Sequence, residues 1–168
     1  MTVRVSSLTL FAMAALLAGC NQSAESGAAN TSEPQYIKAH SAQQLMALVV
    51  QPTAEVFWNS AGFIVDETGE HDLTPTTDEG WAATHTAAAT ITEMGNLLMT
   101  PVYAEGRGDD WIEFSRALVE VGQKAEEAAI ARDSDAVFEV GGTIYNVCTA
   151  CHQAYLPEEQ AAAANAPS

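Results

Sequence analysis

The sequence predicts an all-α protein, an antiparallel up-down-up-down bundle of four helices with a short hairpin-like excursion between the first two. Three observations predict it. Apolar residues make up 48% of the chain, aromatic ones only 7%, and alanine is plentiful, which is typical of packed helices. Apolar residues recur at helical spacing in four segments with mostly short links. No segment shows the sustained alternation that a sheet requires.

Length and charge exclude several classes of protein. The chain has 168 residues, which suits one domain with a substantial core. Its formal net charge is −16, with only 6 Lys and Arg, so we expect no binding to nucleic acid, which needs clustered cations. The high apolar and low charged content argues against wholesale disorder. We find no catalytic acid–base pair or nucleophile constellation and expect no enzyme.

Residues 1–19 have the features of an export signal. Arg4 precedes a short apolar run over residues 8–17, too short to span a bilayer as a helix. The run ends in Leu17-Ala18-Gly19-Cys20, which resembles the lipobox of bacterial lipoproteins. The resemblance implies cleavage before Cys20 and acylation of that cysteine. The alternative is an ordinary signal peptide in which Cys20 is incidental.

The acylated Cys20 would be followed by a flexible tether, so that residues 20–37 link a membrane to a folded domain over residues 38–156. Residues 21–35 are small and polar and cannot bury enough surface to fold. We therefore expect a periplasmic, lipid-anchored protein. Asn21 favours the outer membrane, because the lipoprotein resemblance associates Asp at this position with retention in the inner membrane.

The first helix is predicted to begin at a capping box, Ser41 to Gln44, and to end at Gly62. Pro52 should kink or split it. Its apolar stripe is predicted to comprise Leu45, Leu48, Val49, Pro52 and Val56. Residues 63–75 then fit a short hairpin.

The second helix is predicted to begin at another capping box, Thr76 to Glu79, and to end at Pro101. Asp109 and Asp110 suit the start of the third helix, which should end near Arg132.

The fourth helix should begin at Asp133 or Ser134, and we expect a disordered tail over residues 157–168. The large aromatic side chains expected to anchor the core are Trp58, Trp81, Trp111 and Phe114.

The fourth helical segment contains Cys148-Thr149-Ala150-Cys151-His152, a C-x-x-C-H motif, the attachment site of a c-type haem. On a helix the two cysteines and the histidine stand at i, i+3 and i+4 and point to one side. Two thiols can then form thioethers to the porphyrin vinyl groups, and the imidazole can bind the iron as proximal ligand. The motif predicts one covalent haem c, held by Cys148, Cys151 and His152.

Three alternatives compete for these cysteines. A thioredoxin-like pair would open a helix within a βαβ unit, and none is evident. A zinc site needs four ligands, and His40, His71 and His85 lack a partner spacing. A disulfide between Cys148 and Cys151 would be strained in a regular helix. With zinc or a disulfide, the protein would serve only as an interaction module.

The export signal, four helices and C-x-x-C-H near the C-terminus resemble class II cytochromes c, the group of cytochrome c′ and cytochrome c556. The resemblance covers roughly residues 38–156, and its most specific piece runs from Val140 to Tyr155. Many relatives carry a Lys between the cysteines and a basic residue just after the tyrosine. This chain has Thr149 and Leu156 at those places, so no positive charge at the haem edge is carried over.

Bundle topology limits the sixth iron ligand. In such a bundle the haem end is shared by the start of helix one, the end of helix two and the start of helix three. Met46, Met99 and His40 qualify, whereas His85 lies on the order of 20 Å away at 1.5 Å per residue. Resemblance to cytochrome c556 implies a methionine from the first helix, which maps best onto Met46. Resemblance to cytochrome c′ implies no sixth protein ligand. Met46 could also simply fill the core.

The choice of distal ligand determines the expected function. A filled site favours periplasmic electron transfer, and an open one favours binding of small gases such as NO or CO. The acidic surface favours a periplasmic or membrane redox partner with a basic or apolar patch. The family resemblance also implies a possible homodimer.

Overall fold

Most of the described chain is helical, as predicted. The computed structural model describes residues 36–164, with side chains as far as Tyr155, and these residues belong to one unit, Pro34–Ser168. The predicted signal peptide (1–19), Cys20 and nearly all of the tether (20–37) lie outside the described residues.

The first helical segment has three parts: α1 (Ala42–Leu45), a π-helical turn η1 (Met46–Val50) and α2 (Gln51–Trp58). The predicted capping box is confirmed: the Gln44 N–H donates to the Ser41 hydroxyl at 3.1 Å, and the Ser41 N–H donates to the Gln44 side chain at 3.0 Å. Pro52 lies in the first turn of α2, where a missing N–H is tolerated. Helical backbone continues from α1 through η1 and past Pro52 into α2, so the segment is not split at the proline; the change to a π turn lies directly before it.

The predicted apolar stripe of this segment is wrong at Leu48, Pro52 and Val56, which are all exposed, Leu48 by 63% and Val56 by 46%. The buried positions are Ala42, Leu45, Val50, Ala54 and Phe57. The step from Leu45 to Val50 is five residues, one more than an α-helical turn allows, and it coincides with the π turn.

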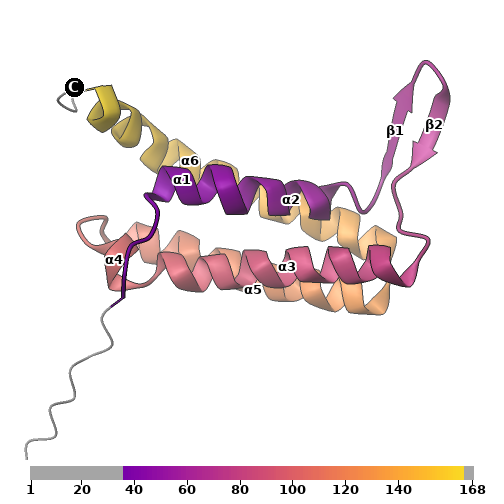
Figure 1. Ribbon diagram of the computed structural model, residues 1–168, viewed down its shortest axis with the longest axis horizontal. Helices are drawn as coiled ribbons and strands as arrows, with labels where there is room; N and C mark the ends of the chain where they lie inside the picture. Colours follow the sequence, from indigo (N-terminus) through magenta and orange to yellow (C-terminus); the bar gives the residue numbers. More distant parts are fainter. Residues whose placement is uncertain (1–35, 165–168) are drawn as a thin grey trace, which may run out of the picture. The chain divides into compact units, whose positions relative to one another are not determined.

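The predicted excursion is an antiparallel hairpin of β1 (Phe63–Asp66) and β2 (Gly69–Asp72), in which Phe63 pairs with Asp72. Every residue of both strands is exposed. The hairpin projects away from the helices between α2 and α3 (Figure 1).

The helix α3 (Asp78–Leu98) begins one residue later than predicted. Its N-cap is Thr77, whose hydroxyl accepts from the Gly80 N–H at 3.0 Å. The third helical position is then Gly80, which has no side chain to complete a capping box, so the predicted Thr76–Glu79 box is wrong. After α3 comes a short helix α4 (Pro101–Ala104), which was not predicted.

The last two helices are α5 (Asp109–Ala131) and α6 (Ser134–Ala164). The predicted end of α5 is confirmed, because Arg132 caps it in the left-handed conformation with φ 55°. The Asp133 side chain accepts from the Ala136 N–H at 3.0 Å at the start of α6. Although a tail was expected from residue 157, α6 continues to Ala164, through a segment rich in Ala, Glu and Gln, which favour helix.

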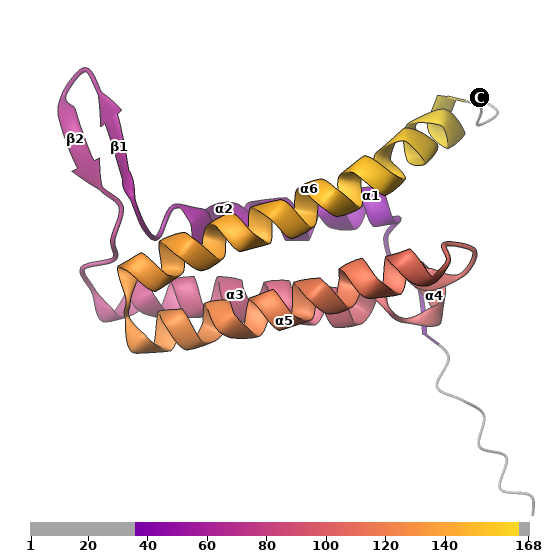
Figure 2. The same ribbon diagram turned by 180° about the vertical axis from the view of Figure 1, so that it is seen from behind.

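The helices pack around one core, but not equally closely (Figures 1 and 2). Helix α3 lies directly against α5, because a Cβ on Gly95 or Gly122 would collide with the facing helix. Helix α5 also packs on α6, and α2 on α3, whereas α2 meets α6 only sparsely. Among the predicted anchors, Trp81 and Trp111 are buried, and Trp58 and Phe114 are half-buried.

Candidate functional site

The C-x-x-C-H motif lies within α6, at a place where the helix is continuous. Cys148, Cys151 and His152 are each half-buried. Their spacing of three and four residues puts them on one side of α6. The three side chains therefore lie on the same side of the helix, as a ligand shared by all three requires.

A cavity of about 430 Å³ lies along the sparse contact between the first helical segment and α6; we call it the seam cavity. Cys148 and His152 border it from α6, and Met46 borders it from η1. The remaining lining residues are Val50, Gln51, Ala54, Trp58, Tyr145, Thr149 and Gln153. Its volume is within the range of sites that hold cofactors.

Two smaller cavities adjoin the same motif. An inner cavity of about 30 Å³ reaches toward α3 and α5, at Leu98, Trp111 and Phe114. An end cavity of about 90 Å³ lies near α1, at Ala42 and Gln43. Cys151 borders both of them, and Met46 and His152 border all three cavities. The structure thus brings the start of the first helical segment, the end of α3 and the start of α5 to the motif.

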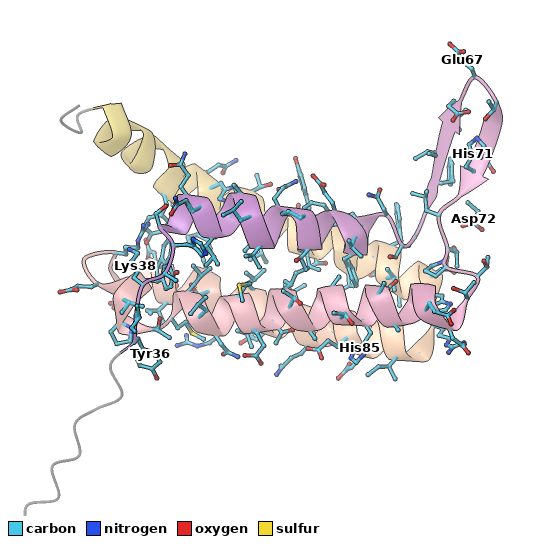
Figure 3. All side chains as sticks on the ribbon, viewed as in Figure 1. Tyr36, Lys38, Glu67, His71, Asp72 and His85 are labelled. Atoms are coloured by element: carbon cyan, nitrogen blue, oxygen red, sulfur yellow. The ribbon has the colours of Figure 1, made fainter. Side chains whose placement is uncertain are left out.

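The other histidines and methionine weighed as ligands lie elsewhere. His40 is exposed, and its carbonyl oxygen accepts from the Tyr103 hydroxyl at 3.1 Å. Met99 is half-buried, but neither it nor His40 is among the described residues that line the three cavities. His85 lies on α3, with its Nε2 3.5 Å from an oxygen of Glu126 (Figure 3). As expected from sequence, His85 is a partly exposed helix histidine with a polar partner.

Trp58 and Tyr145 form one wall of the seam cavity, a role that was not predicted. The Trp58 Nε1–H donates to the backbone carbonyl of Gly141 at 3.0 Å, which links α2 to α6. The Trp58 ring meets the Tyr145 ring edge-on, with centroids 6.2 Å apart. The sequence marks Trp58 only as a core residue, and nothing in the spacing of Tyr145 signals this contact.

An aromatic cluster closes the other side of the motif. Tyr155 lies edge-on to Trp111, with ring centroids 5.1 Å apart, and its hydroxyl donates to the Arg107 carbonyl at 3.0 Å. The Arg107 guanidinium stacks over Trp111 at 4.0 Å from the ring centroid. A cation is therefore present at this end of the helices, although it comes from the α4–α5 loop and not from α6.

The surroundings of the motif are apolar. Burial raises the pKa of the Cys148 thiol, because the thiolate would lose its hydration. In the described part of the chain, no three His, Cys, Asp or Glu side chains form a group that could hold a metal ion. The Cys148 thiol, the His152 imidazole and the Met46 thioether border the apolar seam cavity, and the Cys151 thiol borders the two smaller cavities beside it; this donor set fits a covalently attached haem.

Comparisons with protein-family models, with curated proteins and with solved structures found no match for this chain. Across residues 36–164, no helix combines the length and the apolar character needed to cross a membrane.

Proposed function

We propose that the protein is a monohaem c-type cytochrome of the class II group that transfers electrons in the periplasm. Cys148 and Cys151 would attach the haem, and His152 would bind the iron on the proximal side. The single observation that carries the proposal is that Cys148 and His152 of this C-x-x-C-H motif border an apolar, cofactor-sized cavity that Met46 borders from the first helical segment. A bound haem would supply a one-electron couple between ferric and ferrous iron.

The proposed architecture is an up-down-up-down bundle of four helices. Its members would be the first helical segment (α1, η1 and α2 together), α3, α5 and α6. Support comes from the contacts of α2 with α3, of α3 with α5 and of α5 with α6. The α2–α6 side would be the loose side of the bundle, and it is where the seam cavity lies.

Met46 is the proposed distal ligand. It borders every cavity that His152 borders, and the alternatives Met99 and His40 do not. Trp58, Tyr145 and Val50 would shield the metal from water. A six-coordinate iron would exchange electrons with little rearrangement.

The second candidate is a five-coordinate binder of NO or CO. It is favoured by the apolar surface that Val50 and Ala54 present to the seam cavity, which suits a small neutral ligand. In that case Met46 would pack beside the site without binding iron.

The proposed location is the periplasmic side of a membrane, with a lipid anchor on Cys20. The proposed partners are periplasmic or membrane redox proteins with a basic patch, because the chain carries 22 acidic and 6 basic residues.

Intact mass tests the cofactor directly. When the chain is made with haem-maturation machinery, we expect the mass of one haem added and a coloured protein. A variant with Cys148→Ala and Cys151→Ala should carry no covalent haem. A colourless native chain from a competent host would contradict the proposal.

The visible spectrum tests the distal ligand. We expect low-spin iron in both oxidation states, and a Met46→Leu variant should become high-spin and bind CO readily. Met99→Leu is the matched control and should leave the spectrum unchanged. A high-spin native protein that binds CO would favour the gas-binding candidate, and a low-spin Met46→Leu variant would exclude Met46.

A further inference from the structure

We infer that the π turn η1 sets the direction in which Met46 faces. The turn accommodates one extra residue in the helix, so that Met46 faces the seam cavity. This inference rests on the proposed function, because it concerns how the distal ligand is positioned. Three observations carry it: the buried positions on either side of the turn, the turn's hydrogen bond, and the residues with which Met46 shares a cavity.

The buried positions show the extra residue. An α-helix turns by about 100° per residue, so a residue five positions before Val50 would lie about 140° away from it, on the far side of the helix. Leu45 is that residue, yet it is only 4% exposed and belongs to the same core as Val50. One residue must therefore be accommodated without turning the helix, which is what a π turn does.

The hydrogen bonding agrees with this count. The Gln51 N–H donates to the carbonyl of Met46, five residues back. The next residue, Pro52, has no N–H to offer to the carbonyl of Leu48, so an ordinary α-helical turn would lack a bond at this point in any case. The π turn thus lies where the missing N–H of Pro52 causes the smallest loss of helical hydrogen bonds.

The extra residue changes which way Met46 faces. In an uninterrupted α-helix, Met46 would lie about 80° from Ala54 and about 120° from Trp58 around the axis. With one residue absorbed, it comes within about 20° of both. Met46, Ala54 and Trp58 do line the seam cavity together. The π turn therefore puts Met46 in line with the α2 residues that face α6.

Deletion or insertion of one residue in the π turn tests whether the turn sets the direction in which Met46 faces. Deletion of Ala47, an exposed residue, should convert the turn to regular α-helix and leave Met46 facing the cavity, so the haem-loaded variant should remain low-spin. Insertion of one alanine after Ala47 should turn Met46 by about 100° away from Ala54 and Trp58 and produce high-spin iron. If the deletion removes the low-spin bands as completely as the insertion does, the inference is wrong.

A second pair of variants keeps the chain length constant and so guards against misfolding. In Met46→Leu, the low-spin bands should be lost; in Met46→Leu with Ala47→Met, they should stay lost, because residue 47 is exposed in the π turn. An uninterrupted helix would instead put residue 47 near Ala54 and Trp58, so return of the low-spin bands would overturn the inference. Failure of the native chain to bind haem at all would contradict the proposed function, and it is read separately by intact mass.

Discussion

At the scale of single residues, two adjacent glycines in α6 differ sharply in their surroundings. A Cβ on Gly141 would lie 3.2 Å from Cδ1 of Trp58, and that indole is held by its hydrogen bond to the Gly141 carbonyl. A Cβ on Gly142 would meet nothing within 4 Å. Only Gly141 is therefore required for the approach of α2 to α6.

We expect Gly142→Ala to raise the free energy of unfolding by up to about 1 kcal/mol, because alanine favours helix and meets no neighbour there. Gly141→Ala should not gain this stability, because the added methyl group would push Trp58 from its position. Thermal unfolding of both variants measures the difference. Equal stabilisation by the two substitutions would show that Trp58 adjusts without cost.

At the scale of elements, the four long helical segments and the hairpin could be predicted from the sequence, because capping residues, turn glycines and apolar periodicity are local signals; the short helix α4 was not predicted. Which residues of the first helical segment face the core could not be predicted in this way. The predicted stripe assumed an unbroken helical period, and the π turn shifts that period by one residue, which exposes Leu48 and Val56. The seam cavity could not be predicted for a different reason: Trp58 and Tyr145, which form one of its walls, meet only through tertiary packing.

The crossing of α3 and α5 depends on glycine at two points, and Gly95 is the clearer test. A Cβ there would lie 2.7 Å from the backbone carbonyl of Ser115 and 2.7 Å from Cγ2 of Val119. Since backbone cannot yield cheaply, we expect Gly95→Ala to destabilise the protein by about 1–3 kcal/mol despite its better helix propensity. Denaturant unfolding measures this, with Gly142→Ala as the matched control. A neutral result would mean that α3 and α5 can move apart.

At the scale of the whole molecule, charge governs encounters. A net charge of −16 gives a field that attracts basic partners, and salt screens it over about 30 Å at 0.01 M and about 10 Å at 0.1 M. The identity of a partner cannot be predicted from this, because charge carries no shape. The same holds for the proposed distal ligand, because its position depends on where the helices meet and not on the motif alone.

We expect electron exchange between the haem-loaded protein and a small basic redox protein to slow by about tenfold or more as salt rises from 0.01 M to 0.5 M. Stopped-flow spectroscopy measures the rate. An acidic redox protein serves as the control and should react faster with added salt. Rates independent of salt with both would show that the acidic residues play no part in encounter.

The hairpin of β1 and β2 has a consequence for how the protein behaves in concentrated solution. Phe63, Ile64 and Val65 are exposed on β1, and within residues 36–164 no further strand pairs with the outer edges of the hairpin, an arrangement that favours self-association. Carboxylates surround them, among them Glu67, at the turn, and Asp72 (Figure 3). Hydrogen bonds, first from the Thr68 hydroxyl to Asp66 and from the Thr74 N–H to Asp72, lower the pKa of both carboxyls. The two carboxylates therefore keep their negative charge to a lower pH than ordinary aspartates do, and we expect this charge to oppose pairing of the exposed strands between copies of the chain.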